Sequence, residues 1–378
     1  MIYFSRPSIT ELERRYAAEA LDGLKLSGDG SFTKRVRRFF SERFGMEHFF
    51  LVTSGTHALE MAALLFGLSP GDEVVMPSFT FVSTANAVLL RGAVPVFADI
   101  SPDTLNMDCR GLESLVTART RAIFPVHYAG VPCDMDAVNA LAGEKGLFVA
   151  EDAAQAVGST YKGRPAGALS DAGCFSFHDT KNYTSGEGGG LVLKSADMAE
   201  RAEIMREKGT DRSRFLRGQV DKYTWRGMGS SYLPSDVLAA VLAAQLERFD
   251  EIMEKRMAVW NAYHEAFAPL EAAGKLRRPV IPPECGHNAH LYYLLWPDSA
   301  LRDDFIAFCA ARQITAVFHY IPLHLSPMGK SLGYRPGSLP VTESCAARLV
   351  RLPLYAELTK DEVSAVIEAV FDFARQRL

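Results

Sequence analysis

Residues 49–65 read FFLVTSGTHALEMAALL, in which a short apolar strand breaks at Ser54-Gly55-Thr56 and continues directly into a helix. The same alternation of short apolar runs and longer amphipathic segments continues to about residue 193. It is typical of strand, helix, strand units with a buried and largely parallel sheet. The sequence therefore predicts an α/β fold in this part of the chain.

Six strands and one further strand are expected in this part, at residues 49–53, 73–76, 95–98, 122–126, 147–150, 173–177 and 190–193. Helical stretches start near Gly55, Phe81, Arg110 and Cys133. Each is long enough for the crossover that joins two parallel strands.

The alternating pattern ends at about residue 208. The segment that follows is polar and irregular and reads DRSRFLRGQVDKYTWRGMGSSYLP. Segments of this length without regular structure are usually functional or mobile. A helical pattern over residues 235–267 follows and leads to a smaller C-terminal α+β part. That part is expected to contain strands at 290–296 and 314–318, helices at 300–312 and 342–350, and a final helix from Thr359. A chain of 378 residues is long for one core, and we divide it into domains at 1–248 and 249–378.

Composition excludes several classes of protein. The longest apolar run, residues 237–244, is far shorter than a membrane span, and the start lacks the pattern of a secretory signal, which favours the cytoplasm. The six cysteines contain no C-x-x-C pair, so neither a metal site nor a disulfide framework is expected. The net charge is −4 and the lysines and arginines are dispersed, so the sequence predicts no positively charged surface for nucleic acid. We interpret the basic run KRVRR at 34–38 as the solvent-exposed face of a helix.

The turn at Ser54-Gly55-Thr56 offers unpaired backbone N–H groups and two hydroxyls at the positive end of a helix. This arrangement suits a phosphate dianion. The same residues are also common where a helix is simply capped. The segment alone leaves both interpretations open.

A second candidate is LFVAEDAAQA at residues 147–156, where an apolar strand ends in Glu151 and Asp152. Ligands of open α/β sheets gather at the carboxyl ends of strands, and an acidic group is costly to bury there without a cation. A protonated pyridine nitrogen is such a cation, and its charge makes a pyridoxal ring an electron sink. Asp152 as a helix N-cap is an equal alternative.

A third candidate is CFSFHDTKNYTSGEGGG at residues 174–190, which delivers Ser176 and Lys181 into a glycine-rich loop. The strand would bring the amine of Lys181 near the same sheet edge as Asp152. An isolated lysine is usually a solvated surface residue. A lysine that forms a Schiff base instead needs a lowered pKa, which partial burial and a cationic neighbour supply.

The ordered motifs SGTHAL, PSFTFVSTANAV, EDAAQA, FSFHDTKN and GEGG resemble those of the DegT/DnrJ/EryC1/StrS sugar aminotransferases over essentially the whole chain. LSGDGSFTKR, FPVHYAGV and AVFHYIPLH resemble most closely the dTDP-4-amino-4,6-dideoxygalactose transaminases of that family. The resemblance implies pyridoxal 5'-phosphate (PLP) as cofactor and the fold type I architecture of aspartate aminotransferase. It also implies a homodimer whose active sites are shared between subunits.

Position by position, the resemblance makes Lys181 the Schiff-base lysine and the catalytic acid and base. Asp152 would pair with the pyridine nitrogen, Gln155 would contact the ring and its phenolic oxygen, and Phe81 would stack on the ring. A core phenylalanine is the alternative for Phe81. The resemblance also assigns the phosphate to three residues, Gly55, Thr56 and Ser176.

One departure concerns the family motif G-x-N-x-R, whose asparagine reaches the cofactor phosphate of the neighbouring subunit. Here the stretch reads GSSYL at residues 229–233, so Ser231 supplies one hydroxyl and Leu233 cannot replace the arginine. We assign Ser231 to the cofactor on this basis.

For the substrates, the resemblance implies L-glutamate and a nucleotide-linked keto-sugar, aminated at carbon 4 of a 6-deoxyhexose. The expected sugar contacts are Gly28, Asp29, His178, His319, Tyr320 and His324. Structural roles for the histidines and plain turn roles for the glycines are the alternatives. Alternative substrates are sugars linked to other nucleotides and a 3-keto sugar. Alternative functions are a sugar dehydratase and a non-catalytic PLP-binding regulator. Lys181 argues against the dehydratase, and the lack of a basic recognition helix argues against the regulator.

Overall fold

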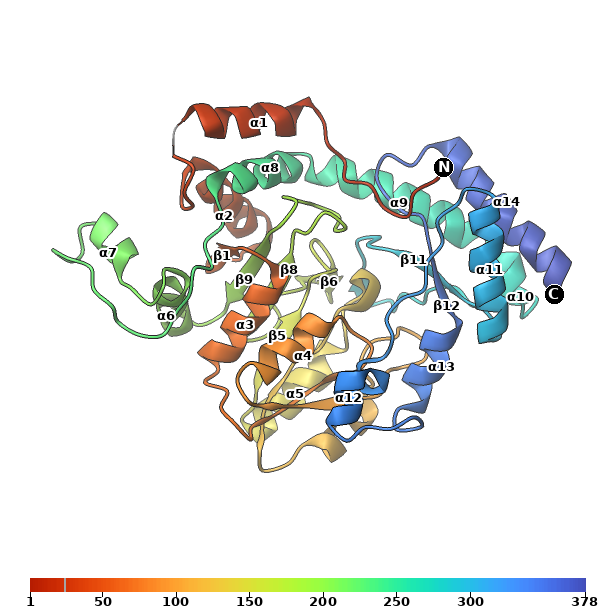
Figure 1. The fold of residues 1–378 in the computed structure, drawn as a ribbon, viewed down its shortest axis with the longest axis horizontal. Coiled ribbons are helices and arrows are strands. Elements are labelled where there is room, and N and C mark those ends of the chain that lie inside the picture. Colours follow the sequence, from red (N-terminus) through yellow and green to blue (C-terminus); the bar gives the residue numbers. More distant parts are fainter. Residues whose placement is uncertain (24) are drawn as a thin grey trace.

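A computed structural model describes residues 1–23 and 25–378 of the chain. Its centre is a seven-stranded sheet in the order β1-β9-β8-β5-β4-β2-β3 (Figure 1). Only β9 runs antiparallel to its neighbours in this sheet. The strands are β1 (Phe49–Val52), β2 (Glu73–Pro77), β3 (Val94–Ala98), β4 (Thr120–Ile123), β5 (Phe148–Asp152), β8 (Ala172–Ser176) and β9 (Gly189–Leu193). The predicted mostly parallel central sheet is confirmed.

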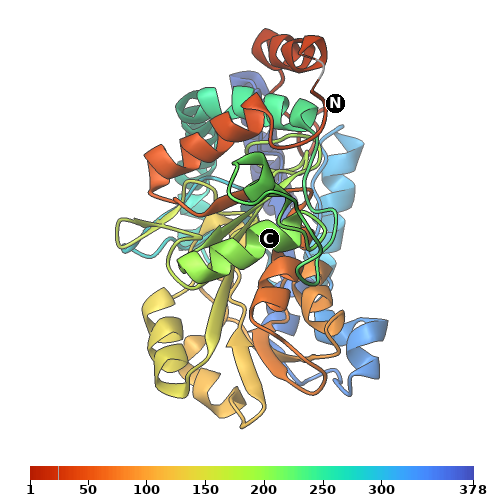
Figure 2. The same ribbon diagram turned by 90° about the vertical axis from the view of Figure 1, so that its left-hand side faces the viewer.

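Helices cover both faces of this sheet, since its strands are apolar on both sides. In β1, Phe50 and Val52 pack in one hydrophobic cluster, while Phe49 and Leu51 pack in the cluster on the opposite face. The covering helices are α3 (Gly55–Leu65), α4 (Val82–Leu89) and α6 (Ala196–Arg206) on the first face, and α5 (Met135–Lys145), α2 (Ser31–Phe44) and α8 (Asp236–Glu247) on the other. Figure 2 shows α5 and the α3–α4 pair on opposite sides of the sheet.

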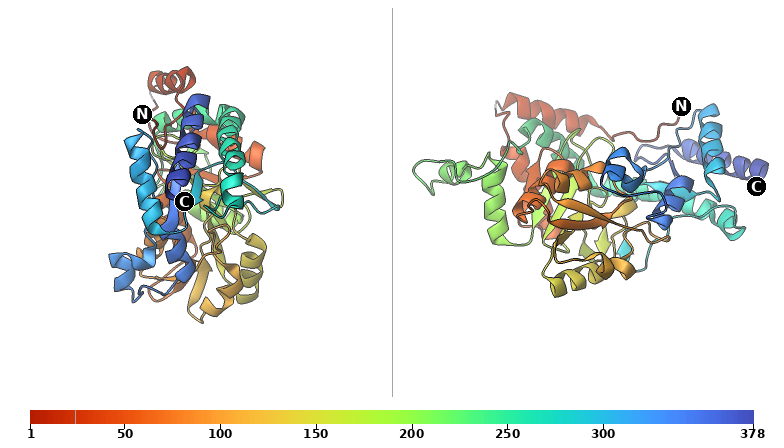
Figure 3. Two further views of the ribbon diagram at one scale, coloured as in Figure 1. Left: turned by 90° about the vertical axis from the view of Figure 1, so that its right-hand side faces the viewer. Right: turned by 60° about the horizontal axis from the view of Figure 1, so that its bottom comes forward.

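The C-terminal part has its own two-stranded sheet, β11 (Tyr292–Leu295) with β12 (Leu349–Leu352). The helices around it are α9 (Phe249–Ala266), α10 (Ala268–Ala272), α11 (Ser299–Ala311), α12 (Pro327–Ser331), α13 (Pro340–Arg348) and α14 (Lys360–Arg377). α8 and α9 are separated at Arg248, next to the domain boundary that we predict at 248/249. Ile2 nevertheless packs in the core of the C-terminal part, and both termini lie at that end of the molecule (Figure 3).

α1 (Glu11–Asp22) packs on α8. The remaining elements are short: α7 (Arg212–Leu216), η1 (Cys109–Leu115), η2 (Tyr128–Gly130), η3 (Leu323–Leu325), β6 (Thr160–Tyr161), β7 (Arg164–Pro165) and β10 (Cys285–Gly286). Within residues 208–232, α7 and the loop after it project from the body of the molecule (Figures 1 and 3). This segment has little regular structure, as predicted.

Two secondary-structure predictions are wrong, and a third is correct except at its C-terminal end. The expected strand at 314–318 forms only isolated bridges at Ile314 and Val317, because each residue pairs with a different segment. The expected helix at 342–350 ends at Arg348, and its last apolar residues form β12 against β11. The expected helix near Arg110 is the 3₁₀ helix η1.

One long-range contact fixes α2 on α8. Gly30 is the N-cap of α2 and has no side chain to satisfy the first N–H groups. The buried carboxylate of Asp236 takes this role: it accepts from the backbone N–H of Phe32 at 3.2 Å and of Thr33 at 2.9 Å. A Cβ at Gly30 would lie 2.0 Å from this carboxylate, so the contact also requires glycine there.

We predict that Asp236→Ala destabilises the apoprotein by about 1–3 kcal/mol, because it leaves buried N–H donors of α2 unpaired. The urea midpoint measures this. The exposed Asp197, in the first turn of α6, provides the matched control Asp197→Ala, which should change the midpoint much less. Equal midpoints for both variants would contradict the assigned role of Asp236.

Candidate active site

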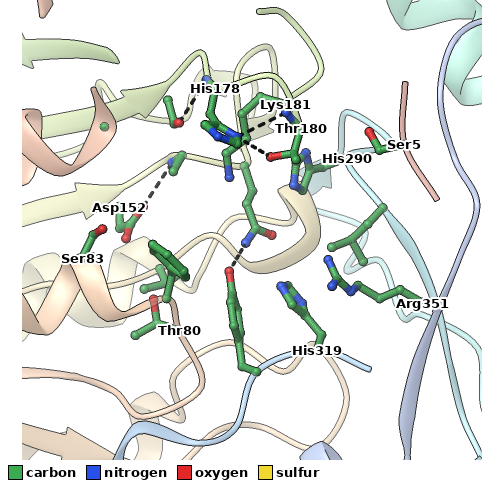
Figure 4. A pocket seen from close by; sticks show the side chains of 18 of the residues that line it. Ser5, Thr80, Ser83, Asp152, His178, Thr180, Lys181, His290, His319 and Arg351 are labelled. Atoms are coloured by element: carbon green, nitrogen blue, oxygen red, sulfur yellow. Dashed lines mark hydrogen bonds between the residues drawn. The ribbon is translucent and has the colours of Figure 1, made fainter. Parts of the chain in front are cut away.

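A cavity of about 690 Å³ lies where the carboxyl ends of the central strands face the C-terminal part (Figure 4). The start of α3 and the ends of β5 and β8 form one wall. Residues 317–320 and Arg351 form another. Ten of the fourteen site residues expected from the sequence line it: Gly55, Thr56, Phe81, Asp152, Gln155, Ser176, His178, Lys181, His319 and Tyr320.

Lys181 follows β8 in a loop, where its backbone N–H donates to the carbonyl of His178 at 2.9 Å. Burial lowers the pKa of the Lys181 amine to about 8, and the positive charge of Arg351 adds to the decrease. The carboxylate of Asp152 acts in the opposite direction. A larger share of this amine is neutral at pH 7 than for an ordinary surface lysine, so it is a better nucleophile.

Asp152 ends β5 and is only 6% exposed. Its Oδ2 accepts from the hydroxyl of Thr84 at 2.7 Å, and its Oδ1 accepts from the backbone N–H of Ala154 at 3.2 Å. Residues 153–158 form turns and no helix, so Asp152 is not a helix N-cap. A buried carboxylate with capacity for a further donor suits a protonated ring nitrogen.

The start of α3 forms one corner of the cavity. Ser54 caps the helix, since its Oγ accepts from the N–H of His57 at 3.1 Å. Gly55 and Thr56 are the first residues of α3, whose N–H groups have no acceptor within the helix. A Cβ at Gly55 would lie 2.9 Å from Cβ of Ser176, so glycine lets the helix start approach the end of β8. Simple capping and anion binding are compatible here, because different residues serve them.

Gln155 and Phe81 reach the cavity from the part of the chain that forms the central sheet. The Oε1 of Gln155 accepts from the N–H of Ala129 at 2.8 Å, and its Nε2 donates to the hydroxyl of Tyr320 at 3.0 Å. These bonds fix the orientation of the amide. Phe81 precedes α4 and is 57% exposed, so it is not a core phenylalanine. Its exposed ring at the cavity is suited to stacking on an aromatic ligand.

Three of the expected sugar contacts also line the cavity. His319 is buried, with its Nδ1 2.9 Å from the hydroxyl of Tyr128. Tyr320 adopts a left-handed backbone with φ of 45°, a strained conformation for a tyrosine that is often found at functional sites. His178 lies beside the lysine loop, with its Nδ1 3.0 Å from Oγ1 of Thr180.

The other four expected residues lie outside this cavity. His324 is fully buried between Ser78, at 2.7 Å, and Glu343, at 3.0 Å, which is the structural role that the sequence left open. Asp29 makes two hydrogen bonds with Arg206, at 2.8 and 2.9 Å. Gly28 packs on Leu233 and Pro234, and Ser231 is exposed.

Sequence reasoning missed several residues of the cavity wall, notably Arg351, His290 and Phe4. One signal for Arg351 was available, because an arginine interrupts the apolar run LVRLPL at residues 349–354. His290 is partly buried and its Nδ1 lies 2.9 Å from Oδ1 of Asn182. Removal of the ring from water holds its pKa well below the usual value. Phe4 carried no such signal, since it reaches the cavity only through the packing of the N-terminus.

These residues fit PLP. Lys181 supplies an amine, Asp152 a buried carboxylate, Phe81 an exposed aromatic ring, and the start of α3 an anion site. In the described ranges, 1–23 and 25–378, no group of histidine, cysteine and acidic side chains is arranged to hold a metal ion. No helix over these ranges is long and apolar enough to cross a membrane.

Comparison with known proteins agrees with this geometry. Residues 7–371 match the DegT/DnrJ/EryC1/StrS aminotransferase family. GDP-perosamine synthase of Caulobacter vibrioides is 35% identical over 373 residues, which cover 98% of this chain and 97% of that protein. The spore coat polysaccharide biosynthesis protein SpsC of Bacillus subtilis is 35% identical over 387 residues, with 98% and 97% covered.

Among solved structures, the PMP-form of the putative sugar aminotransferase Spr1654 of Streptococcus pneumoniae matches with a TM-score of 0.93 and 27% identity, over 100% of both chains. The same protein has also been solved in a PLP-form. The fold is therefore that of the PLP-dependent aminotransferases. The chain belongs to the DegT/DnrJ/EryC1/StrS aminotransferase family and is a PLP-dependent sugar aminotransferase.

Proposed function

We propose that the protein transfers the amino group of L-glutamate to carbon 4 of a nucleotide-linked 6-deoxyhexose. The proposed acceptor is dTDP-4-keto-6-deoxy-D-glucose, and the product is dTDP-4-amino-4,6-dideoxy-D-galactose. One observation carries the proposal: the Lys181 amine, with its pKa lowered by burial, shares a cavity with the buried Asp152 carboxylate.

Bound PLP supplies an electron sink that stabilises negative charge at the carbon bonded to the amino group. We assign Lys181 as the group that attaches the cofactor and carries a proton to and from that carbon. Asp152 holds the ring nitrogen in its protonated form, and Gln155 and Phe81 orient the ring. Gly55, Thr56 and Ser176 bind the phosphate. A positioned acid and base of this kind contributes about 10²- to 10⁴-fold in rate.

The choice of sugar depends on the dTDP-sugar motifs, including HYIPLH at residues 319–324, of which His319 and Tyr320 line the cavity. A second acceptor class has a specific observation in its favour. A relative with 35% identity is a GDP-perosamine synthase, so a GDP-linked keto-sugar is the alternative.

We further propose a homodimer in which each active site includes residues of the partner. Gly28, Asp29 and Ser231 lie outside the cavity of their own chain, where a second subunit could use them. The projecting segment 208–232 supports this arrangement, since Leu216 is 66% and Trp225 78% exposed. Such large apolar side chains are costly to leave in water.

Lys181→Ala should remove turnover while leaving the fold intact, because it deletes both the attachment point and the proton carrier. The assay offers PLP, L-glutamate and dTDP-, UDP- and GDP-linked keto-sugars, with products identified by mass and NMR. We expect the wild type to consume the dTDP sugar and yield the galacto amine. Lys194→Ala, at an exposed lysine, is the control. Wild-type turnover by Lys181→Ala would end the catalytic assignment, and a preference for the GDP sugar would favour the alternative.

The rate at which apoprotein attaches PLP should rise as pH increases through about 8 and then level off. The reason is that the neutral amine is the nucleophile and burial lowers the Lys181 pKa to about 8. Borohydride trapping followed by mass spectrometry measures the rate. Asp152→Asn should move the midpoint to lower pH, since the carboxylate raises this pKa. A midpoint near the usual lysine value of about 10.4 would contradict the assignment.

Leu216→Asp and Trp225→Asp should weaken the dimer and reduce activity together, because each buries a charge in the proposed interface. Sizing chromatography coupled to light scattering gives the mass. The same change at Leu378, the exposed C-terminal residue, is the control. A fully active wild-type monomer would refute the shared active site.

A further inference from the structure

Arg351 enters the cavity from a rigid position in the C-terminal part. It belongs to β12, where it pairs with Tyr293 of β11. On its other side it exchanges two backbone hydrogen bonds with Val317, at 2.7 and 3.1 Å. Because the backbone is held on both sides, the starting point of the side chain is fixed. Figure 4 shows this side chain directed toward the cavity, on the same side as His319.

The guanidinium is only partly satisfied by the protein. Its Nη2 donates to the carbonyl of Phe318 at 3.0 Å, and the ring of Phe4 covers the group at 4.5 Å. The Nε is buried without a hydrogen-bond partner. A partly buried cation with free donors is costly unless an anion completes it, and the planar fork of arginine matches a carboxylate with two parallel hydrogen bonds.

No other described residue of the cavity wall supplies a lasting positive charge near Arg351. Burial holds the pKa values of His290 and His319 well below the usual value, and the charge of Arg351 adds to both decreases. Both imidazoles are therefore neutral at pH 7. The remaining cation, Lys181, is assigned to the cofactor in the proposed function. An anionic substrate group in this part of the cavity therefore has Arg351 as its counter-charge.

We propose that Arg351 binds a carboxylate of the amino donor and is a specificity-determining residue for L-glutamate. The proposal rests on the proposed function. A donor α-carboxylate is bonded to the same carbon as the reacting amine, so its binding group must lie in the cavity that contains Lys181. Arg351 meets this condition. The diphosphate of a nucleotide sugar is farther from its reacting carbonyl, and binding of that group is the competing outcome.

The steady-state test uses the holoenzyme with Arg351→Gln, Arg351→Lys and the control Arg375→Gln, a charge-matched change at an exposed residue of α14. We expect Arg351→Gln to raise the KM for glutamate about 10- to 100-fold, as for loss of hydrogen bonds to a charged group. The KM for the keto-sugar should stay close to that of the wild type. Arg351→Lys should recover part of the loss, since it keeps the charge without the planar fork. Thermal melting establishes that each variant is folded.

Two further measurements do not depend on the complete reaction. Glutarate, a dicarboxylate without an amino group, should bind the wild-type apoprotein in calorimetry and bind Arg351→Gln at least tenfold more weakly. Single-turnover conversion of the PLP form by L-alanine identifies which carboxylate is bound. A similar loss with alanine and glutamate indicates the α-carboxylate, and a loss confined to glutamate indicates the side-chain carboxylate.

An unchanged glutamate KM in Arg351→Gln overturns the proposal. If the KM for the keto-sugar rises instead, Arg351 binds the diphosphate. A wild type that takes no amino group from glutamate refutes the proposed donor. In that case, glutarate binding that is equal in wild type and Arg351→Gln refutes the role of Arg351 separately.

Discussion

The cavity is organised by opposite charges that are kept out of water at one edge of the sheet. Asp152 ends β5, and Lys181 follows the neighbouring strand β8. Burial disfavours the charged amine, while the Asp152 carboxylate favours it, and the balance gives a lysine pKa of about 8. Both side chains depend on the parallel pairing of β5 with β8, because that register brings the two strand ends together. The remaining features of the site extend from this pair.

The two walls of the cavity are held together by buried polar contacts as well as by packing. His324 does not line the cavity. It links Ser78, which follows β2, to Glu343 of α13 through its two ring nitrogens. Residues 319 and 320, in the same loop, are thereby placed against the part that forms the central sheet, where Tyr320 accepts a hydrogen bond from Gln155. A hydrophobic cluster that includes Phe79 and Tyr293 closes the junction. The loop that carries the expected sugar contacts is therefore fixed from both sides, which suits selection between similar substrates.

Two features of the surface have no explanation within a single chain. Large apolar side chains remain exposed within the segment 208–232, and Gly28, Asp29 and Ser231 do not line the cavity of their own chain. A second subunit would cover the exposed side chains and would bring these three residues to its own cavity. In the proposed arrangement the part with the central sheet would supply the cofactor groups, the C-terminal part would supply Arg351 for the donor, and the partner would complete the sugar site.

The sequence by itself determined the sheet, most of its covering helices and the residues that we propose for the cofactor, because these depend on local periodicity and on motifs within short stretches. It failed where distant segments decide the outcome. The last two residues of the run at 342–350 became strand because β11 was available to pair with them, and Asp236 caps α2 from about 200 residues away. The position of Arg351 in the cavity and of His324 outside it also required the tertiary structure. Both are polar side chains in apolar surroundings, and only packing decides whether such a group meets a protein partner or an open cavity.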